Sequence, residues 1–286
     1  MNRTLAALVT ALSISIGGCN IQPVEYQQQE QRRGPVPAQT YVGEYENNNN
    51  SLAEGKLESL EQSVEMLRLE AEYCAIGPNG QCDTAKKNEQ VQWRGSGTVV
   101  HQDGQYMYIL TAGHVALPEP EVQTFLGDKY KLVGKPKIII EGKNIPLEFI
   151  SGLNNDSMDY AYLRTPKTSR LKVMDAKIGD SSKISIGDMV YVIGYPLTTG
   201  RSISAGNISC IVQQTPASRG GKVTPEQFMF TSPISGGNSG GPIFTIKGGV
   251  LYLIGIAVAT YPAGQNLNIG VKTNDILRYT NANVKP

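Results

Sequence analysis

The spacing of apolar and polar residues changes along the chain. From residue 92 onward, short apolar runs rich in β-branched and aromatic residues alternate with turns of Gly, Pro, Asn and Asp. Such spacing is typical of an all-β sandwich or barrel, and no long amphipathic helices alternate with the runs as an α/β sheet would require. A last short helix is expected over residues 274–280. The clearest predicted strands are Gly97–Val100, Tyr106–Leu110, Lys137–Ile140, Met189–Ile193 and Val250–Ile254.

Residues 51–73 have a helical pattern instead. Ser51 and Glu54 have the spacing of a capping box. We expect a helix that packs on its own domain; alternatively, its apolar stripe forms a short coiled coil that makes the protein oligomeric. The stripe consists of apolar residues spaced by three and four, namely Leu57, Leu60, Val64, Leu67 and Ala71.

The first apolar run lies at the N-terminus. Arg3 precedes an apolar segment that is too short to span a bilayer stably, which predicts a cleaved signal peptide over residues 1–18. The sequence Ile-Gly-Gly-Cys that ends at Cys19 resembles a bacterial lipobox, and this implies a lipid anchor in the cell envelope, facing the periplasm or the exterior. An ordinary secretory signal is the alternative. Because Asn20 is not the aspartate that marks inner-membrane retention, we favour the outer membrane.

Two further segments precede the β-rich region. Residues 19–50 are rich in Gln, Asn, Pro and Glu and are expected to be a disordered tether. Residues 51–90 should contain the helix and a small loop, in which Cys74 and Cys82 flank a Pro-Asn-Gly turn. In an oxidising compartment these cysteines would form a disulfide; two unpaired thiols are the alternative.

Charge and composition exclude several classes of function. The chain has 286 residues and a net charge of +1, so its overall charge does not favour nucleic acid as a partner. The chain has two histidines. His101 fits a hairpin turn, and His114 fits proton transfer, better than either fits zinc binding. We therefore expect neither metal nor cofactor. The glycine-rich loop around Ser239 lacks the Gly-Lys-Ser/Thr of a nucleotide-binding loop.

Three short segments carry residue types suited to nucleophilic catalysis. His114 follows a predicted strand, Asp159 opens the sequence Asp-Tyr-Ala-Tyr-Leu, and Ser239 lies in Gly-Asn-Ser-Gly-Gly-Pro. A serine hydroxyl is a weak nucleophile and needs a neighbouring base. In this order and on a β-rich background, the segments resemble the trypsin-like, chymotrypsin-fold serine endopeptidases, most nearly the bacterial Deg-type branch.

This resemblance covers about residues 90–280 and implies a protease domain over residues 91–286. The expected fold is all-β: two six-stranded antiparallel Greek-key barrels, preceded by the short N-terminal helix. The resemblance implies that Ser239 attacks, that His114 is the base, and that Asp159 orients the imidazole, with an acyl-enzyme as intermediate. The N–H groups of Gly237 and Ser239 would form the oxyanion hole.

Other residues compete for these roles. Asp156 lies three positions before Asp159 and is expected to be a turn residue, because Asp159 fits the family's Asp-x-Ala-x-Leu arrangement. His101 precedes a turn signature and is expected at the end of a hairpin. Asn238 stands where digestive enzymes carry an aspartate, so their activation by a new N-terminus is not expected here.

Substrate preference follows from the absence of acidic residues near the expected specificity pocket, formed by Ile234, Val258 and Thr260. Without a carboxylate there, we expect small or medium apolar side chains before the cleaved bond. The PDZ domains of many Deg-type enzymes are not expected. The leading hypothesis is therefore a serine endopeptidase acting on envelope or extracellular proteins and peptides; the alternative is a catalytically silent protease-fold lipoprotein that acts as a binding scaffold.

Overall fold

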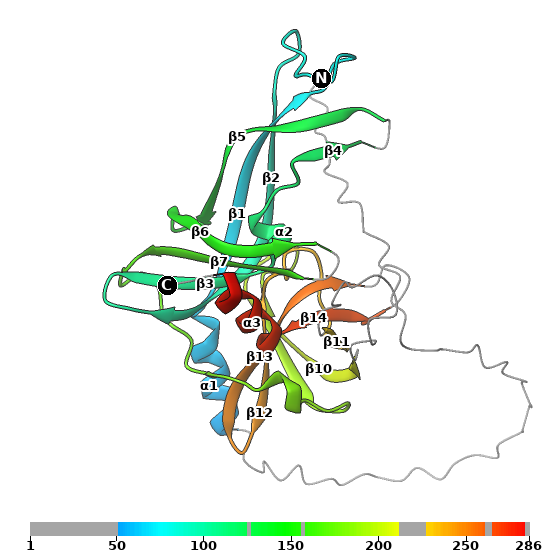
Figure 1. The fold of residues 1–286 in the computed structure, drawn as a ribbon. Helices are drawn as coiled ribbons and strands as arrows, with labels where there is room; N and C mark the ends of the chain where they lie inside the picture. Colours follow the sequence, from blue (N-terminus) through cyan, green and yellow to red (C-terminus); the bar gives the residue numbers. More distant parts are fainter. Residues whose placement is uncertain (1–50, 125–126, 156–157, 212–226, 261–264, 284–286) are drawn as a thin grey trace, which may run out of the picture.

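The structure is a computed structural model that describes residues 51–124, 127–155, 158–211, 227–260 and 265–283 (Figure 1). The predicted signal peptide, Cys19 and the tether lie outside these residues, as does Asp156. None of the described helices is long and apolar enough to cross a membrane.

The first barrel is closed by six antiparallel strands in the order β1-β2-β3-β7-β6-β5, because β5 pairs with β1 as well as with β6. A short strand, β4 (Glu121–Gln123), is added to the outer side of β5, and helix α2 (Gly113–Ala116) directly follows β3. The strands of the barrel are β1 (Val64–Ala75), β2 (Glu89–Gln102), β3 (Tyr106–Thr111), β5 (Lys129–Ile140), β6 (Ile145–Asn154) and β7 (Asp159–Pro166).

The second barrel repeats this strand order. It is closed as β9-β10-β11-β14-β13-β12, with the short β8 (Lys177–Ile178) parallel to β13. Two 3₁₀ turns, η1 (Ser181–Lys183) and η2 (Pro196–Thr198), flank β9, and α3 (Thr273–Asn283) follows β14. The strands are β9 (Met189–Gly194), β10 (Ser202–Ile211), β11 (Gln227–Phe230), β12 (Pro242–Lys247), β13 (Val250–Thr260) and β14 (Asn268–Lys272). The predicted fold of two six-stranded barrels is confirmed, as are the predicted strands and the last helix.

One continuous apolar core joins the two barrels. It fills the first barrel and extends to Ile193, Phe244 and Val258 of the second, while a separate cluster around Phe228 and Phe230 fills the interior of the second barrel. Burial of this shared surface holds the barrels in a fixed relation, so loops from both can contribute to one site between them.

The prediction of one helix over residues 51–73 is wrong beyond Glu61. Helix α1 spans Ser51–Glu61, and the following residues form β1, which pairs with both β2 and β5. Leu67, Leu69, Ala71 and Tyr73 are buried at every second position, as in a strand with one face toward a core. The expected stripe is therefore divided between two elements, so a helix 51–73 that oligomerises the protein does not exist. The first barrel also begins well before residue 91.

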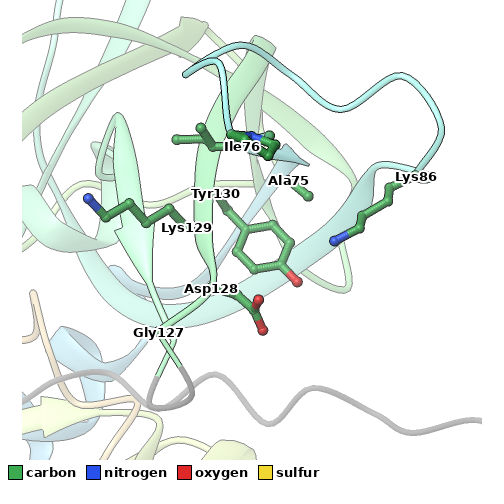
Figure 2. Close-up of a pocket in the computed structure, with 9 residues that line it drawn as sticks. Ala75, Ile76, Lys86, Gly127, Asp128, Lys129 and Tyr130 are labelled. Atoms are coloured by element: carbon green, nitrogen blue, oxygen red, sulfur yellow. The ribbon is translucent and has the colours of Figure 1, made fainter.

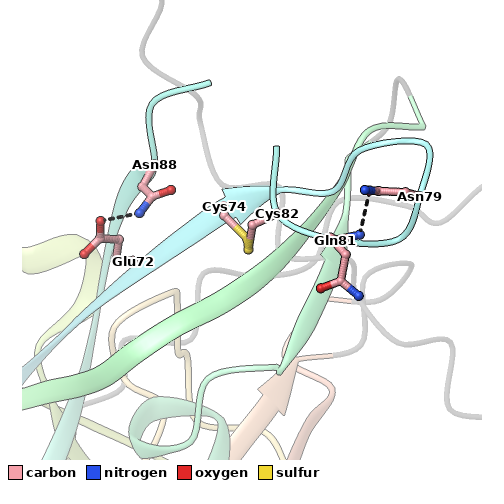
Figure 3. Close-up of a disulfide and its surroundings, with 6 residues drawn as sticks. All are labelled: Glu72, Cys74, Asn79, Gln81, Cys82 and Asn88. Carbon is pink, nitrogen blue, oxygen red and sulfur yellow. Dashed lines mark hydrogen bonds between the residues drawn. A yellow bond between two sulfur atoms is a disulfide. The ribbon is translucent and has the colours of Figure 1, made fainter. Parts of the chain in front are cut away.

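The outer halves of β1, β2 and β5, together with β4, project from the first barrel as an arm (residues 70–94, 119–124 and 127–137; Figure 1). At its tip a disulfide joins Cys74 to Cys82, with the Cα atoms 5.5 Å apart. The side-chain oxygen of Asn79 accepts a hydrogen bond from the N–H of Gln81 inside the loop, and Asn88 donates to Glu72 where β2 begins (Figure 3). These links order both ends of the β1–β2 connection.

A hollow of about 340 Å³ lies beside the disulfide loop and is lined by Ile76 and Pro78 of that loop and by Asp128 to Tyr130 at the start of β5 (Figure 2). Ala75, which lines it, is nine residues along β1 from Met66, the partner of Ser96 in the body of the barrel. At roughly 3.3 Å per residue this is about 30 Å. The hollow is therefore remote from the residues described next.

Candidate active site

His114 and Asp159 form a close pair on the first barrel. His114 lies in α2, just after β3, and Asp159 begins β7, which pairs with β3. The imidazole Nδ1 lies 2.6 Å from Asp159 Oδ2, and the backbone N–H of His114 donates to Asp159 Oδ1 at 2.8 Å. Two contacts from one carboxylate fix both the ring and the backbone that carries it, and leave Nε2 of the ring for another partner.

The surroundings of His114 set its protonation. Burial lowers the pKa of the imidazole, but the hydrogen bond to Asp159 and the charge of that carboxylate outweigh burial, and the pKa is raised above its ordinary value. The His114 side chain is nevertheless 36% exposed, so a substrate can reach it from one side. An imidazole in this state can accept a proton and hold it.

Ser239 lies on the second barrel, in the loop before β12, and this loop abuts the segment that leads to His114. Gly240, with φ of +81°, lies so near that segment that a Cβ there would be 2.2 Å from Thr111 Oγ1 and 2.7 Å from the N of Ala112. Only glycine fits so close an approach. The two barrels therefore bring His114, Asp159 and Ser239 to one boundary.

The peptide groups around Ser239 are oriented by hydrogen bonds to their carbonyls. Gly237 has a φ of +98°, which favours glycine, and the N–H of Leu197 donates to the carbonyl of Gly236 at 2.7 Å. Within the described residues, neither the N–H of Gly237 nor that of Ser239 donates a hydrogen bond. Two such N–H groups can stabilise a developing oxyanion.

Ser96 of β2 connects this loop to the first barrel, a role that sequence reasoning missed. Its Oγ donates to the carbonyl of Gly237 at 2.7 Å and accepts from the N–H of Tyr195 at 3.0 Å. Its backbone N–H donates to the carbonyl of Ser239 at 2.8 Å. Ser96 is fully buried and donates to the carbonyls of Gly237 and Ser239, the two residues whose N–H groups have no acceptor in the described part of the chain. The one signal in the sequence is its place between two glycines.

A buried polar residue that sequence reasoning also missed lies beside the segments expected to form the specificity pocket. Ile234 is half-buried, Val258 is buried and Thr260 is exposed. Asn268 pairs with Thr260 across β13 and β14, is 1% exposed, and donates from Nδ2 to the carbonyl of Ser232 at 2.6 Å. Asn268 thus bridges the two segments expected to form the pocket. Its Oδ1 and the Oγ of Ser232 are buried and have no hydrogen-bond partner among the residues that the structure describes.

The remaining histidine lies apart from this site. His101 is exposed near the β2–β3 hairpin and stacks on Tyr108, with the ring centroids 5.7 Å apart. In the described part of the chain, no group of three His, Cys, Asp or Glu side chains is placed to hold a metal ion.

Comparison with known proteins identifies related domains. The trypsin-like peptidase domain matches residues 95–256, more than half of the chain. A probable periplasmic serine endoprotease of the DegP-like type from Pseudomonas putida is 28% identical over 58% of this chain and 29% of its own length. A probable periplasmic serine protease, do/HhoA-like, from Haemophilus influenzae is 30% identical over 62% of this chain and 34% of its own. The chain thus spans about a third of the length of these relatives.

Solved structures share the fold. The HtrA-type protease AlgW with a decapeptide superposes with a TM-score of 0.53 at 19% identity, over 79% of this chain and 66% of that one. An inactive form of Rv3671c from M. tuberculosis H37Rv gives a TM-score of 0.52 at 15% identity, over 84% of this chain and 96% of that one. At this level of identity the likeness to solved structures shows the fold alone. The match to the trypsin-like peptidase domain also shows the family. The chain belongs to the trypsin-like peptidase family.

Proposed function

We propose that the protein is a serine endopeptidase that hydrolyses peptide bonds of envelope or extracellular proteins through an acyl-enzyme. The observation that carries the proposal is the pair formed by His114 and Asp159 at 2.6 Å, next to a serine loop in which two N–H groups, those of Gly237 and Ser239, have no acceptor among the described residues. Neither half of this arrangement is needed to stabilise a binding scaffold, whereas both are needed for acyl transfer.

In the proposed mechanism, Ser239 Oγ attacks the carbonyl carbon of the scissile bond while His114 Nε2 takes its proton. Asp159 holds the ring by Nδ1 and stabilises the imidazolium that forms. The carbonyl oxygen becomes an oxyanion that accepts hydrogen bonds from the N–H groups of Gly237 and Ser239. His114 then donates its proton to the leaving amine. In the second half-reaction a water attacks the acyl-enzyme, His114 takes a proton from that water, and Ser239 Oγ is released with this proton.

The specificity pocket would lie between Ile234 on one side and Val258 and Thr260 on the other. Asn268 supports the proposed preference for small or medium side chains, because its buried amide lies beside Thr260 and is bonded to the carbonyl of Ser232. A longer side chain would have to displace a buried amide and its hydrogen bond, which costs free energy.

The proposed location is the bacterial cell envelope, with the mature chain anchored by a lipid on Cys19 and the outer membrane favoured. The relatives described as periplasmic are compatible with an envelope location. Metabolic labelling with an alkyne fatty acid tests the anchor. Label on the wild type that is lost in Cys19→Ala is expected; equal labelling of both would contradict it.

The first experiment on the activity uses a fluorophosphonate probe, which reacts with activated serines. We expect labelling of the purified protein without residues 1–18, and loss of labelling in Ser239→Ala and in His114→Ala. His101→Ala is the matched control, because it removes the other histidine from the same barrel and should label normally. A folded wild type that does not label would contradict the proposal and favour the silent scaffold.

A further inference from the structure

The turn η2 lies against the loop that precedes Ser239. The N–H of Leu197 in this turn donates to the carbonyl of Gly236 at 2.7 Å. The carbonyl of Gly236 and the N–H of Gly237 belong to one planar trans peptide group, so they point in opposite directions. The bond from Leu197 therefore fixes the direction of the Gly237 N–H, one of the two donors assigned to the oxyanion hole.

This turn has a strained backbone. Leu197 has a φ of +50° and Thr198 a φ of +58°, a left-handed conformation that costs free energy in residues other than glycine. The Leu197 side chain is 68% exposed, so its packing does not hold the turn. The bonds inside the turn, from Thr198 to Tyr195 and from Thr199 to Pro196, close it but do not attach it to the rest of the protein. Such a conformation persists only where the surrounding structure fixes it.

Tyr195, the residue before the turn, attaches it on several sides. Its N–H donates to Ser96 Oγ at 3.0 Å, and its carbonyl abuts Gly237, where a Cβ would lie 2.2 Å from the carbonyl oxygen. Its hydroxyl donates to the carbonyl of Val64 at 3.3 Å and accepts from Nε of Arg201 at 2.9 Å. The guanidinium of Arg201 also lies over the ring, with Cζ 5.6 Å from the ring centroid. One side chain therefore joins the turn to the first barrel.

The acceptor of the Tyr195 hydroxyl is itself firmly held. Val64 is the first residue of β1 and is fully buried, as are Leu60 near the end of α1 and Ser63 between the two elements. Ser63 donates from both its N–H and its hydroxyl to the carbonyl of Leu60. The match to the trypsin-like peptidase domain begins only at residue 95. The hydroxyl of Tyr195 therefore connects the oxyanion hole to a part of the chain that precedes the matched domain.

We infer that Tyr195 is a positioning residue for the proposed hydrolysis: by holding η2 to the start of β1, it keeps the N–H of Gly237 directed into the oxyanion hole. The inference deepens the proposed function and rests on it. Tyr195 takes no part in proton transfer, because the hydrogen bonds of its hydroxyl run to Val64 and Arg201. Loss of the hydroxyl should therefore weaken stabilisation of the transition state, while substrate binding and the protonation of His114 stay the same.

The first test is Tyr195→Phe, which removes the hydroxyl and keeps the ring. With a short peptide substrate we expect kcat to fall about fivefold to tenfold, the effect of one net hydrogen bond, with little change in KM. Affinity for a peptide boronate should fall by a similar factor, and the acid limb of the pH profile should keep its midpoint. Tyr191→Phe is the matched control, because this hydroxyl, on β9, bonds to Met189 Sδ at 3.1 Å and should not affect turnover. An unchanged kcat in Tyr195→Phe, or equal losses in both variants, would overturn the inference.

A second variant tests the link to β1. Leu60→Ala loosens the buried end of α1, so it should lower kcat in the wild-type background and have a smaller effect in Tyr195→Phe, where the link is already broken. A general loss of stability would act equally in both backgrounds, so equal effects would overturn the inference. Circular dichroism checks that each variant is folded at the assay temperature. If the folded wild type cleaves no peptide, the proposed endopeptidase fails, and the inference fails with it; activity without this coupling contradicts the inference alone.

Discussion

The two barrels share one strand order but contribute to the site in different ways. The first supplies side chains: the imidazole of His114 and the carboxylate of Asp159, held as a pair. The second supplies backbone: the N–H groups of Gly237 and Ser239, which donate to no described residue, in a loop whose carbonyls accept hydrogen bonds from Ser96 of the first barrel. Substitutions of His114 or Asp159 in the first barrel should therefore alter proton transfer and its pH dependence. Substitutions around the second should alter the oxyanion hole and the fit of the substrate.

The largest effect should come from the first barrel. In Asp159→Asn the amide can hold the ring in the wrong tautomer and carries no charge to stabilise the imidazolium. We expect kcat to fall by about 10⁴-fold, the loss typical of a triad aspartate. Steady-state kinetics on a short peptide measures this, with circular dichroism as the control for folding. A loss below about tenfold would remove Asp159 from the proposed mechanism.

Ser96 tests the link between the barrels. Ser96→Ala removes the bond to the carbonyl of Gly237 and should lower kcat by about 10- to 100-fold with little change in KM, less than the loss of a direct oxyanion donor. Thr98→Val is the matched control, because the Thr98 hydroxyl is buried on the same strand but contacts Ser63. A positioning role also predicts weaker binding of a peptide boronate to Ser96→Ala alone. Equal kinetic losses in both variants would indicate a general effect on stability.

The pH profile of kcat/KM tests the His114–Asp159 pair without any substitution. His114 must be neutral to accept a proton, so activity falls as the pH drops through its pKa. Because Asp159 raises that pKa, the midpoint of the acid limb should lie above about 6.5, the ordinary value for histidine. The same shift means that the charged pair stabilises the fold at acidic pH and that this contribution is lost as the pH rises through the raised pKa. A midpoint of the acid limb below about 6 would contradict the raised pKa of His114.

The smallest effect concerns selectivity. Asn268→Gly empties the space beside Thr260 and should raise the ratio of cleavage after Leu to cleavage after Ala by about tenfold. A peptide library measures the ratio. Ser232→Ala is the control, because it removes a nearby buried hydroxyl that has no partner while leaving Asn268 in place. An unchanged ratio in a folded Asn268→Gly would place the pocket elsewhere.

The sequence predicts the regular parts of this molecule better than the contacts between them. Strands such as Met189–Gly194 follow from local composition, and the segments around His114, Asp159 and Ser239 stand out by their motifs. The apolar pattern of residues 64–73 fits a helix and a strand equally well. Val64, Leu67 and Ala71 have the spacing of a helix. Leu67, Leu69, Ala71 and Tyr73 have the alternation of a strand. Pairing with β2 and β5 decides between them. Ser96 is bonded to a residue 141 positions away, and Asn268 to a residue 36 positions away. A local sequence pattern cannot indicate partners at such separations.

Closure of each barrel by strands distant in sequence also determines when the site can form as the chain is synthesised. The first barrel is complete once β7 ends at Pro166, so His114 and Asp159 can meet early. The second barrel closes only with β14, which begins at Asn268. Domains generally fold as units and in order from the N-terminus. In the proposed mechanism, a partly made chain would then carry the base and no ordered nucleophile, so proteolysis would begin only when almost the whole of this sequence has emerged.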